Sequence, residues 1–266
     1  MHVASLFRAC TLTAATLLSA CASTEGGAET ESDIQRGKSE SGYPAVGMLA
    51  FASGAFGTGT LIRPDVVLTA GHVVDGSIVE FYYGAPKSGT STHYLNLQHV
   101  KVADKVRGEC YEAPGATLRS TCPGVLDIGL VRLATPIRDV EPILMDERTA
   151  AQILVDASAS RAGVAVGFGC HTTSTGAHTY RERRSATSFL DRFNTTEILV
   201  KSATGIATSG DSGGPLLLGG KIIGTVRGSV IRTKDGDPCG RVLEGYTRLD
   251  LSLPWIKSHL EKWNAL

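Results

Sequence analysis

The segment GDSGGP at residues 210–215 encloses one serine, Ser212, between an aspartate and two glycines. A serine hydroxyl is a weak nucleophile at its ordinary pKa and needs a base within hydrogen-bond reach. Glycines at this spacing let the backbone turn sharply, expose the hydroxyl and admit a substrate carbonyl close to the main chain. The backbone N–H groups of Gly210 and Ser212 would then face the place where the oxygen of a tetrahedral intermediate forms. The segment indicates acyl-transfer chemistry at Ser212; a glycine-rich turn with an incidental serine is the alternative.

Two further segments offer a base and a residue to orient it. His72 ends the run LTAGH, which follows an apolar stretch typical of a strand. Asp127 lies at the start of another apolar run, LDIGLVRL. A buried carboxylate is unfavourable unless it is paired, and a histidine N–H would pair it while leaving the other ring nitrogen free as a base. We therefore expect His72 to be the general base and Asp127 to orient it, although a lone histidine is more often a surface or core residue.

The elements that must position these residues are mostly strands. From Ile34 onward, short apolar runs rich in Val, Ile and Thr alternate with Gly, Pro, Ser and Asp, which is typical of an all-β protein. The smoothest boundary is the polar stretch 145–160, so the chain suggests two barrels or sandwiches. A helix is predicted at the C-terminus, where the large apolar residues fall near one helical face: Trp255, Ile256, Leu260 and Trp263.

The first residues have the composition of an export signal. Arg8 precedes a run of apolar and small residues at 9–20, and such segments are removed from the mature protein. The run ends in LSAC, which resembles the lipobox of bacterial lipoproteins, where the cysteine, here Cys21, is acylated and becomes the mature N-terminus. Ordinary cleavage after Ala22 is the alternative. The small, acidic segment 22–33 is expected to be a flexible tether or pro-segment.

These features predict an exported protein. It is expected to be an outer-membrane or periplasmic lipoprotein anchored at Cys21, or to be secreted extracellularly. The formal net charge is zero, with 26 Lys and Arg against 26 Asp and Glu, so nothing points to nucleic acid as a partner. No C-x-x-C pair or His–Cys cluster has the spacing of metal ligands. We expect a monomer without metal or other cofactor.

The cysteine count also suits an oxidising compartment. The chain has six cysteines, at positions 10, 21, 110, 122, 170 and 239. The first leaves with the signal, and if the second carries a lipid, an even number remains. Four cysteines allow three connectivities. Pairing of the nearest two, Cys110 and Cys122, leaves Cys170 and Cys239 to pair with each other.

Taken together, the three chemical segments resemble the trypsin-like (chymotrypsin) family of serine proteases. The order His72, Asp127, Ser212, with separations of 55 (127 − 72) and 85 (212 − 127) residues, matches that family. The resemblance covers nearly all of the chain after the tether and includes TAGH, DIGLVRL, GVAVGFG, GDSGGP, GTV and GYTRL. It implies two six-stranded antiparallel Greek-key β-barrels with a C-terminal α-helix, and an active site in the crevice between the barrels.

The resemblance places these units along the chain and implies their activity. The N-terminal barrel would span about 34–145, the C-terminal barrel about 155–250 and the helix about 252–264. The implied activity is that of a serine endopeptidase, which hydrolyses protein or peptide substrates through an acyl-enzyme on Ser212. Two alternatives stay open: a catalytically idle homologue that serves as a binding module, and an esterase that uses the same triad.

The resemblance also implies an activation step. In the family, cleavage frees the α-amine of an isoleucine, here Ile34. The new ammonium pairs with the aspartate before the nucleophile, here Asp211, and locks the oxyanion loop. The preceding residue, Asp33, departs from the family, which more often has a basic residue there. A permanent tether, never cleaved before Ile34, is the alternative.

Specificity and disulfides complete the set of implied sites. The residue six before the nucleophile forms the floor of the family's primary pocket, and here it is Ile206, with Ser229 and Gly245 near other lining positions. An apolar floor favours small or apolar side chains at the cleaved residue over basic ones. Cys239 stands where the family often has a disulfide cysteine, but its usual partner position before the nucleophile loop has none, which leaves Cys170 as its partner.

Overall fold

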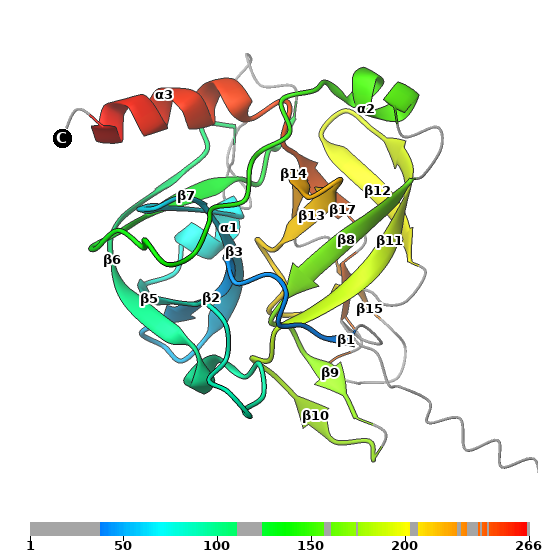
Figure 1. The fold of residues 1–266 in the computed structure, drawn as a ribbon. Coiled ribbons are helices and arrows are strands. Elements are labelled where there is room, and N and C mark those ends of the chain that lie inside the picture. Colours follow the sequence, from blue (N-terminus) through cyan, green and yellow to red (C-terminus); the bar gives the residue numbers. More distant parts are fainter. Residues whose placement is uncertain are drawn as a thin grey trace, which may run out of the picture.

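The computed structural model contains two β-barrels and a C-terminal helix (Figure 1). It describes residues 38–110, 124–156, 161–173, 175–202, 207–227, 230–232, 239, 241–243 and 245–264. Within these ranges, no helix is both long and apolar enough to cross a membrane.

The N-terminal barrel is a closed sheet in the order β2-β3-β4-β7-β6-β5. Its strands are β2 (Val46–Phe51), β3 (Phe56–Arg63), β4 (Val66–Thr69), β5 (Ile78–Tyr83), β6 (Gln98–Arg107) and β7 (Gly129–Leu133). All neighbouring strands in this ring are antiparallel. Its interior is filled by large apolar side chains, among them Leu49, Leu61, Val67, Phe81 and Val131. Burial of these side chains stabilises the barrel by about 1.5–3 kcal/mol each.

The C-terminal barrel contains β8 (Ala162–Gly167), β11 (Arg184–Phe193), β12 (Glu197–Ser202), β13 (Pro215–Leu218), β14 (Lys221–Val226) and β17 (Gly245–Arg248). The strands follow the order β11-β12-β17-β14-β13-β8, and a pairing of β11 with β8 closes the ring. Strand β1 (Lys38–Ser39) adds to the edge of β11. If the six strands of each barrel are counted along the chain, both rings have the cyclic order 1-2-3-6-5-4. The predicted fold class is therefore confirmed.

Short helices and two-stranded ribbons connect the barrel strands or lie outside the barrels. Helix α1 (Gly71–Val74) follows β4, a 3₁₀ turn η1 (Tyr94–Asn96) precedes β6, and α2 (Ala150–Asp156) precedes β8. Two small ribbons stand apart from the barrels: β9 (His171–Thr172) with β10 (His178–Thr179), and β15 (Val230–Arg232) with β16 (Arg241–Leu243).

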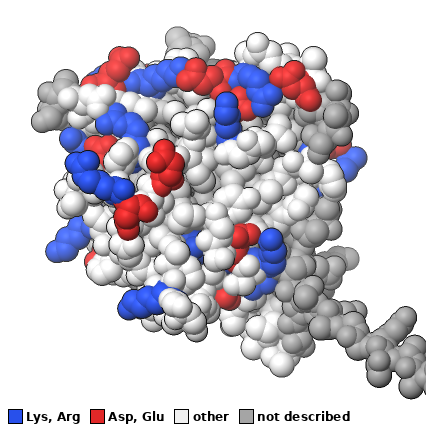
Figure 2. All heavy atoms as spheres, viewed as in Figure 1, with Lys and Arg blue, Asp and Glu red and all other residues white. Residues whose placement is uncertain are grey.

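Helix α3 (Leu253–Asn264) runs back across the N-terminal barrel (Figure 1). Ile256 and Trp263 are buried, and Trp255 and Leu260 pack against the same cluster. That cluster combines side chains from β4 and β7 with others from β8, β13 and β14, so the helix covers the seam between the barrels. The predicted helix and its apolar face are confirmed. Its outer face carries charges of both signs, which line the upper edge of the surface in Figure 2.

The cation Arg183 lies in the junction between the barrels. It precedes β11, is fully buried and donates to three backbone carbonyls. Those of Val46 and Gly84 belong to the N-terminal barrel, and that of Glu40 belongs to the segment leading into it. The guanidinium therefore ties the N-terminal segment and both barrels together. Burial lowers the pKa of Arg183 to about 10.

Candidate active site

The paired ends of β4 and β7 bring His72 and Asp127 together. Thr69 lies opposite Gly129 in this antiparallel pair, so the residues just after β4 meet those just before β7. The backbone N–H of His72 donates to Asp127 Oδ1 at 2.8 Å, and His72 Nδ1 lies 2.6 Å from Asp127 Oδ2. The Asp127 side chain is 5% exposed, whereas that of His72 is 34% exposed. An Nδ1–H donated to a buried carboxylate leaves Nε2 free to accept a proton.

Close packing holds the turn that carries Ser212 against the segment before His72. At Gly213, φ is 83°, and an added Cβ would collide with Thr69 Oγ1 and lie 2.8 Å from the amide nitrogen of Ala70. The N–H of Gly213 donates to the carbonyl of Val226 at 2.9 Å, which fixes the turn to the C-terminal barrel. Only a glycine permits this approach. It places Ser212 at the seam of the two barrels, beside the helix that carries His72.

Hydrogen bonds within the turn set the direction of two peptide groups. The carbonyl of Ser209 accepts from the N–H of Cys170 at 3.0 Å, and the carbonyl of Asp211 accepts from the N–H of Gly214 at 2.8 Å. In a trans peptide the N–H points opposite to the C=O, so the N–H groups of Gly210 and Ser212 point away from these partners. Neither donates to any group in the described part of the chain. The two expected oxyanion donors thus lie on one turn with both N–H groups unused.

The position of Gly210 in the turn also requires a residue without a side chain. Its φ is 100°, in the left-handed region, and an added Cβ would collide with the ring of Phe56. A larger residue would have to displace this ring or change the peptide orientation that the turn depends on.

Thr58 links this turn to both barrels. From β3, its N–H donates to the carbonyl of Ser212 at 2.9 Å, and its hydroxyl donates to the carbonyl of Gly210 at 2.8 Å. Its own carbonyl accepts from the hydroxyl of Thr69 at 2.7 Å, two residues before α1. The N–H of Phe168 donates to the Thr58 hydroxyl at 3.2 Å. Sequence reasoning missed Thr58, because its partners lie more than 100 residues away, except for Thr69.

Asp211 is buried at the centre of the turn. Its Oδ1 accepts from the N–H of Gly169 at 2.7 Å, and its Oδ2 accepts from the N–H of Thr208 at 2.8 Å, with the Thr208 hydroxyl 3.2 Å away. Burial raises the pKa of Asp211 to about 6, against these hydrogen bonds and the charge of Arg184, which lower it. Its expected partner Ile34 lies outside the described residues, and so does Cys21.

The predicted pocket is described only in part. Gly245 begins β17, pairs with Leu199 and accepts at its carbonyl from the N–H of Arg227 at 3.0 Å. Ile206 and Ser229 lie outside the described residues. Near Gly245, Arg227 Nη1 forms an ion pair with Glu197 Oε1 at 2.7 Å, which the sequence alone did not indicate.

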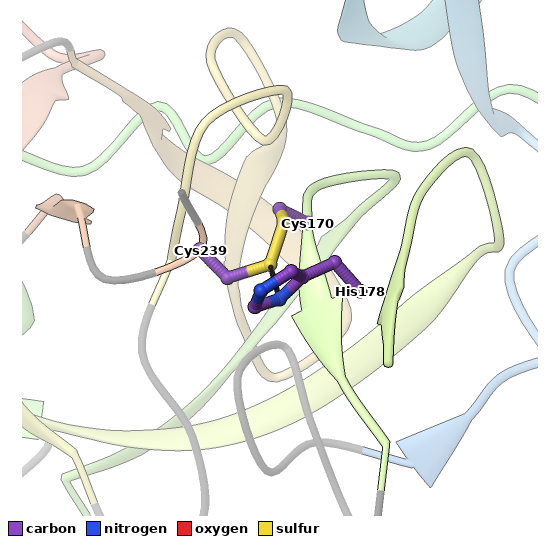
Figure 3. A group of neighbouring side chains, drawn as sticks. All are labelled: Cys170, His178 and Cys239. Carbon is purple, nitrogen blue, oxygen red and sulfur yellow. Dashed lines mark hydrogen bonds between the residues drawn. A yellow bond between two sulfur atoms is a disulfide. The ribbon is translucent and has the colours of Figure 1, made fainter. Parts of the chain in front are cut away.

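A disulfide joins Cys170 and Cys239, with their Cα atoms 5.1 Å apart (Figure 3). This pairing was predicted and is confirmed. His178 Nδ1 lies 3.3 Å from Cys239 Sγ, and one donor atom of each of these three residues falls within 4.8 Å of the others. Because both sulfurs share the disulfide, they are not thiolate ligands for a metal in this state. Cys110 is also disulfide-bonded, and its expected partner Cys122 lies outside the described residues.

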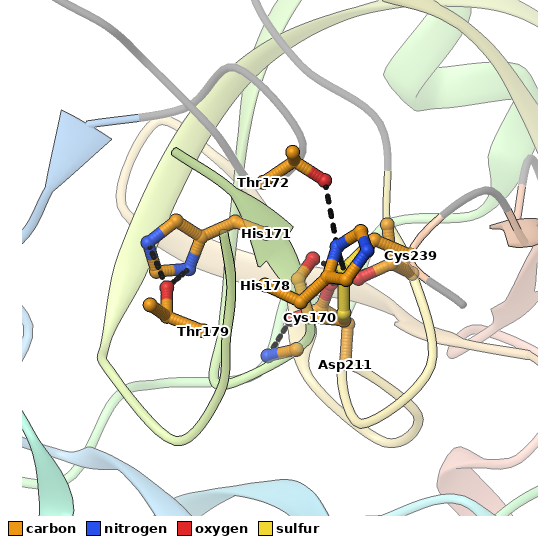
Figure 4. Close-up of a disulfide and its surroundings, with 9 residues drawn as sticks. Cys170, His171, Thr172, His178, Thr179, Asp211 and Cys239 are labelled. Atoms are coloured by element: carbon orange, nitrogen blue, oxygen red, sulfur yellow. Dashed lines mark hydrogen bonds between the residues drawn. A yellow bond between two sulfur atoms is a disulfide. The ribbon is translucent and has the colours of Figure 1, made fainter. Parts of the chain in front are cut away.

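The disulfide lies next to the nucleophile loop (Figure 4). The carbonyl of Cys170 accepts from the hydroxyl of Thr208 at 2.7 Å, and its N–H donates to Ser209. The sequence gives no indication of a role for Thr208, because a threonine three residues before the aspartate looks like an ordinary loop residue until its contact with Cys170 is seen.

Comparison with known proteins agrees with this geometry. The family model described as Trypsin matches residues 33–256. Neuropsin, a serine protease expressed in the limbic system of mouse brain, has a TM-score of 0.60 and 20% identity, covering 82% of this chain and 95% of that one. The scabies mite inactivated protease paralogue S-D1 has a TM-score of 0.61 and 16% identity, with 86% and 97% covered. Human heparin binding protein has a TM-score of 0.60 and 18% identity, with 85% and 95% covered. At these identities the structural likeness concerns the fold.

Proposed function

The chain belongs to the trypsin family of serine proteases, and from this premise we propose that it is an endopeptidase that cleaves peptide bonds through an acyl-enzyme on Ser212. Proteases of this family act on protein or peptide substrates. The observation that carries the proposal is the pairing of His72 Nδ1 with Asp127 Oδ2 at 2.6 Å, beside a turn that packs Gly213 against Ala70. This arrangement combines a base, its orienting acid and a serine at one seam.

The proposed reaction uses these groups in sequence. His72 Nε2 takes the proton of Ser212 Oγ as that oxygen attacks the substrate carbonyl, and Asp127 stabilises the imidazolium that forms. The carbonyl oxygen becomes an oxyanion, which accepts hydrogen bonds from the N–H groups of Gly210 and Ser212. Collapse breaks the C–N bond, and His72 gives its proton to the leaving amine. Water then attacks the ester, again with His72 as the base, and releases the acid and Ser212.

Two alternatives are less well supported. An idle homologue is a real option, because an inactivated paralogue shares the fold. The unused N–H groups of Gly210 and Ser212 instead favour the enzyme, since an idle turn has no need to keep two donors without partners. An esterase would use the same atoms, so only a test of substrates, and not the structure, can distinguish it from a peptidase.

The finer features of the proposal follow from the sequence. Ile206, Ser229 and Gly245 are proposed to line the primary pocket and to favour small or apolar side chains. The signal segment supports export, with Cys21 as a lipid anchor or with release of the protein. The disulfide between Cys170 and Cys239 fits an oxidising compartment.

A serine-reactive phosphonate probe tests the proposal. The mature protein is treated with the probe, and the modified residue is mapped by mass spectrometry. Labelling is expected at Ser212 and should be lost in His72→Ala, because the hydroxyl is a poor nucleophile without its base. Ser88→Ala, at an exposed serine, is the matched control and should label normally. Failure of the folded wild-type protein to label would exclude the enzyme, and labelling with hydrolysis of esters but not of peptides would favour the esterase.

A further inference from the structure

The carboxylate of Asp211 accepts hydrogen bonds at both oxygens from the described part of the chain. The side chain is buried, and both oxygens accept backbone N–H groups, from Gly169 and from Thr208. The single hydroxyl proton of Thr208 is shared between the carbonyl of Cys170 at 2.7 Å and Asp211 Oδ2 at 3.2 Å. No cation forms an ion pair with Asp211 in the described part of the chain.

This set of partners is shaped for a carboxylate. At Gly169, an added Cβ would lie 2.5 Å from the Asp211 Cγ and 2.6 Å from the Thr208 Oγ1. At Gly167, it would lie 2.9 Å from the same Cγ. Two glycines, one at the end of β8 and one just after it, therefore make room for Asp211 against the backbone. Figure 4 shows Asp211 beside Cys170, whose N–H holds the carbonyl of Ser209.

The position of Asp211 decides whether the oxyanion donors are in place. Asp211 lies between Gly210 and Ser212, so a change in backbone torsions that carried its side chain out of this site would also turn the peptide groups on either side. The segment just after β8 binds both groups: the N–H of Gly169 donates to the Asp211 carboxylate, and the N–H of Cys170 donates to the carbonyl of Ser209. The second bond fixes the direction of the Gly210 N–H. Anchoring Asp211 and orienting the donors are therefore one structural event.

We propose that Thr208 is a positioning residue for the oxyanion turn: its amide and hydroxyl, with the amide of Gly169, hold Asp211 in the uncleaved chain, so that the turn is assembled without a new N-terminus at Ile34. The inference rests on the proposed function, because an oxyanion turn matters only if Ser212 is acylated. It replaces the expected ammonium of Ile34 with groups already present in the fold.

Charged and titratable groups around Asp211 determine how this site responds to pH. Arg184 on β11 lowers the pKa of Asp211, and Tyr246 on β17 faces it as a neutral phenol whose own pKa is raised. Burial raises the pKa of Asp211 to about 6, and the Thr208 hydroxyl opposes that rise. Loss of this hydroxyl should therefore raise the pKa further and weaken the hydrogen bonds from the amides at a pH where the wild-type carboxylate is still ionised.

Three variants test the role of Thr208. In Thr208→Val, kcat on a peptide substrate is expected to fall about tenfold with little change in KM, and the acid limb of kcat should move to higher pH. Thr208→Ser keeps the hydroxyl and should restore both. Thr60→Val, at another buried threonine whose hydroxyl has no partner in the described residues, is the control for a simple Thr-to-Val change. A kcat and pH profile of Thr208→Val equal to those of Thr60→Val would overturn the proposal.

A second measurement does not depend on these variants folding. The full chain, shown by intact mass to be uncleaved before Ile34, is titrated with the phosphonate probe in parallel with the chain cleaved at that bond. The proposal expects the labelled fractions and rates to agree within about twofold. Labelling only after cleavage would overturn it and restore the role of the Ile34 ammonium, while the proposed function would stand. Absence of labelling in both forms would instead remove the proposed function.

Discussion

At the scale of single residues, the proposed role of His72 as a base depends on which of its ring nitrogens carries the proton. Asp127 accepts both the backbone N–H of His72 and its Nδ1–H. These two bonds hold the imidazole in one orientation and in the tautomer that leaves Nε2 without the proton. The sequence motifs identified these residues, because their chemistry is carried by residue type and by order along the chain.

Asp127→Asn should lower kcat by about four orders of magnitude with a small effect on stability. The amide is similar in size to the carboxylate, but its NH₂ group can face Nδ1 and favour the tautomer with the proton on Nε2. Steady-state kinetics on a peptide substrate would measure the loss, with thermal unfolding as the check on the fold. A variant that retains a tenth of wild-type kcat would show that Asp127 does not orient the base.

Asp211 gives a prediction about stability and pH. Its pKa is raised from 3.8 in the unfolded chain to about 6 in the fold, so the folded state binds more protons between these values. The free energy of unfolding should therefore fall as pH rises from about 4 to 6, by about 3 kcal/mol if the full shift is realised. Asp211→Asn does not titrate, so its stability relative to wild type should increase over the same interval. Urea unfolding at pH 4 and pH 7 would measure the difference, and parallel curves for the two proteins would contradict it.

Not all residues of the site could be predicted from sequence. Ser212, His72 and Asp127 carry motifs, but Thr58 and Thr208 act through contacts that depend on the docking of two barrels. Thr58 bonds to Gly210 across 152 positions of sequence, and Thr208 reaches Cys170 across 38. A threonine in a strand or loop has no local pattern that reveals such a partner.

At the scale of elements, the barrel strands and the C-terminal helix could be predicted from the sequence, whereas the short elements β1 and α2 could not. Short apolar runs with glycine and proline between them indicated the barrels, and helical periodicity indicated α3. Strand β1 is only two residues long and exists because it pairs with β11, which the local sequence cannot show. Helix α2 lies within the polar stretch 145–160, which the sequence favours as a boundary, and Ile153 provides its buried contact.

The disulfide between Cys170 and Cys239 holds the segment after β8 next to the nucleophile loop. It closes a loop of 69 residues, and removal should cost about 4 kcal/mol on the chain-entropy account. The double variant Cys170→Ser, Cys239→Ser should unfold at lower urea concentration. It should also lose kcat, because Cys170 contacts Thr208 and Ser209. Reduction of the wild-type protein should reproduce both effects, with a further loss of stability from the disulfide of Cys110, which the double variant keeps. Unchanged kcat in a destabilised but folded double variant would separate the disulfide from the oxyanion turn.

At the scale of the whole molecule, the two barrels are joined by a buried cation. Arg183 donates to carbonyls of Glu40, Val46 and Gly84, while its Nη2 has no partner in the described residues. Its position at the seam depends on carbonyls that lie 99 to 143 positions away in sequence, so the local run of residues 181–184 does not reveal it. The desolvation of the guanidinium is offset only in part by backbone acceptors from segments far apart in sequence.

Arg183→Met should lower the free energy of unfolding by about 2–4 kcal/mol, because it leaves three buried carbonyls without donors. Arg192→Met, at a side chain that is 67% exposed, is the matched control and should change stability by less than about 0.5 kcal/mol. Chemical denaturation would measure both. A neutral Arg183→Met would mean that the methionine's packing compensates for the lost hydrogen bonds and that the cation is not needed at the seam.

The shared cyclic strand order has a consequence for how the chain can be divided. Each ring takes its six strands from one half of the chain. Among the described strands, only the short β1 pairs with a strand of the other half, and the isolated bridge between His93 and Glu182 also joins the halves. A cut in the exposed stretch at Arg138 and Asp139 would leave every ladder within a barrel intact. His72 and Asp127 would then reside on one fragment, and Ser212 with its proposed oxyanion donors on the other. Neither fragment alone would hold a working set of groups, and hydrolysis would report directly on their reassociation.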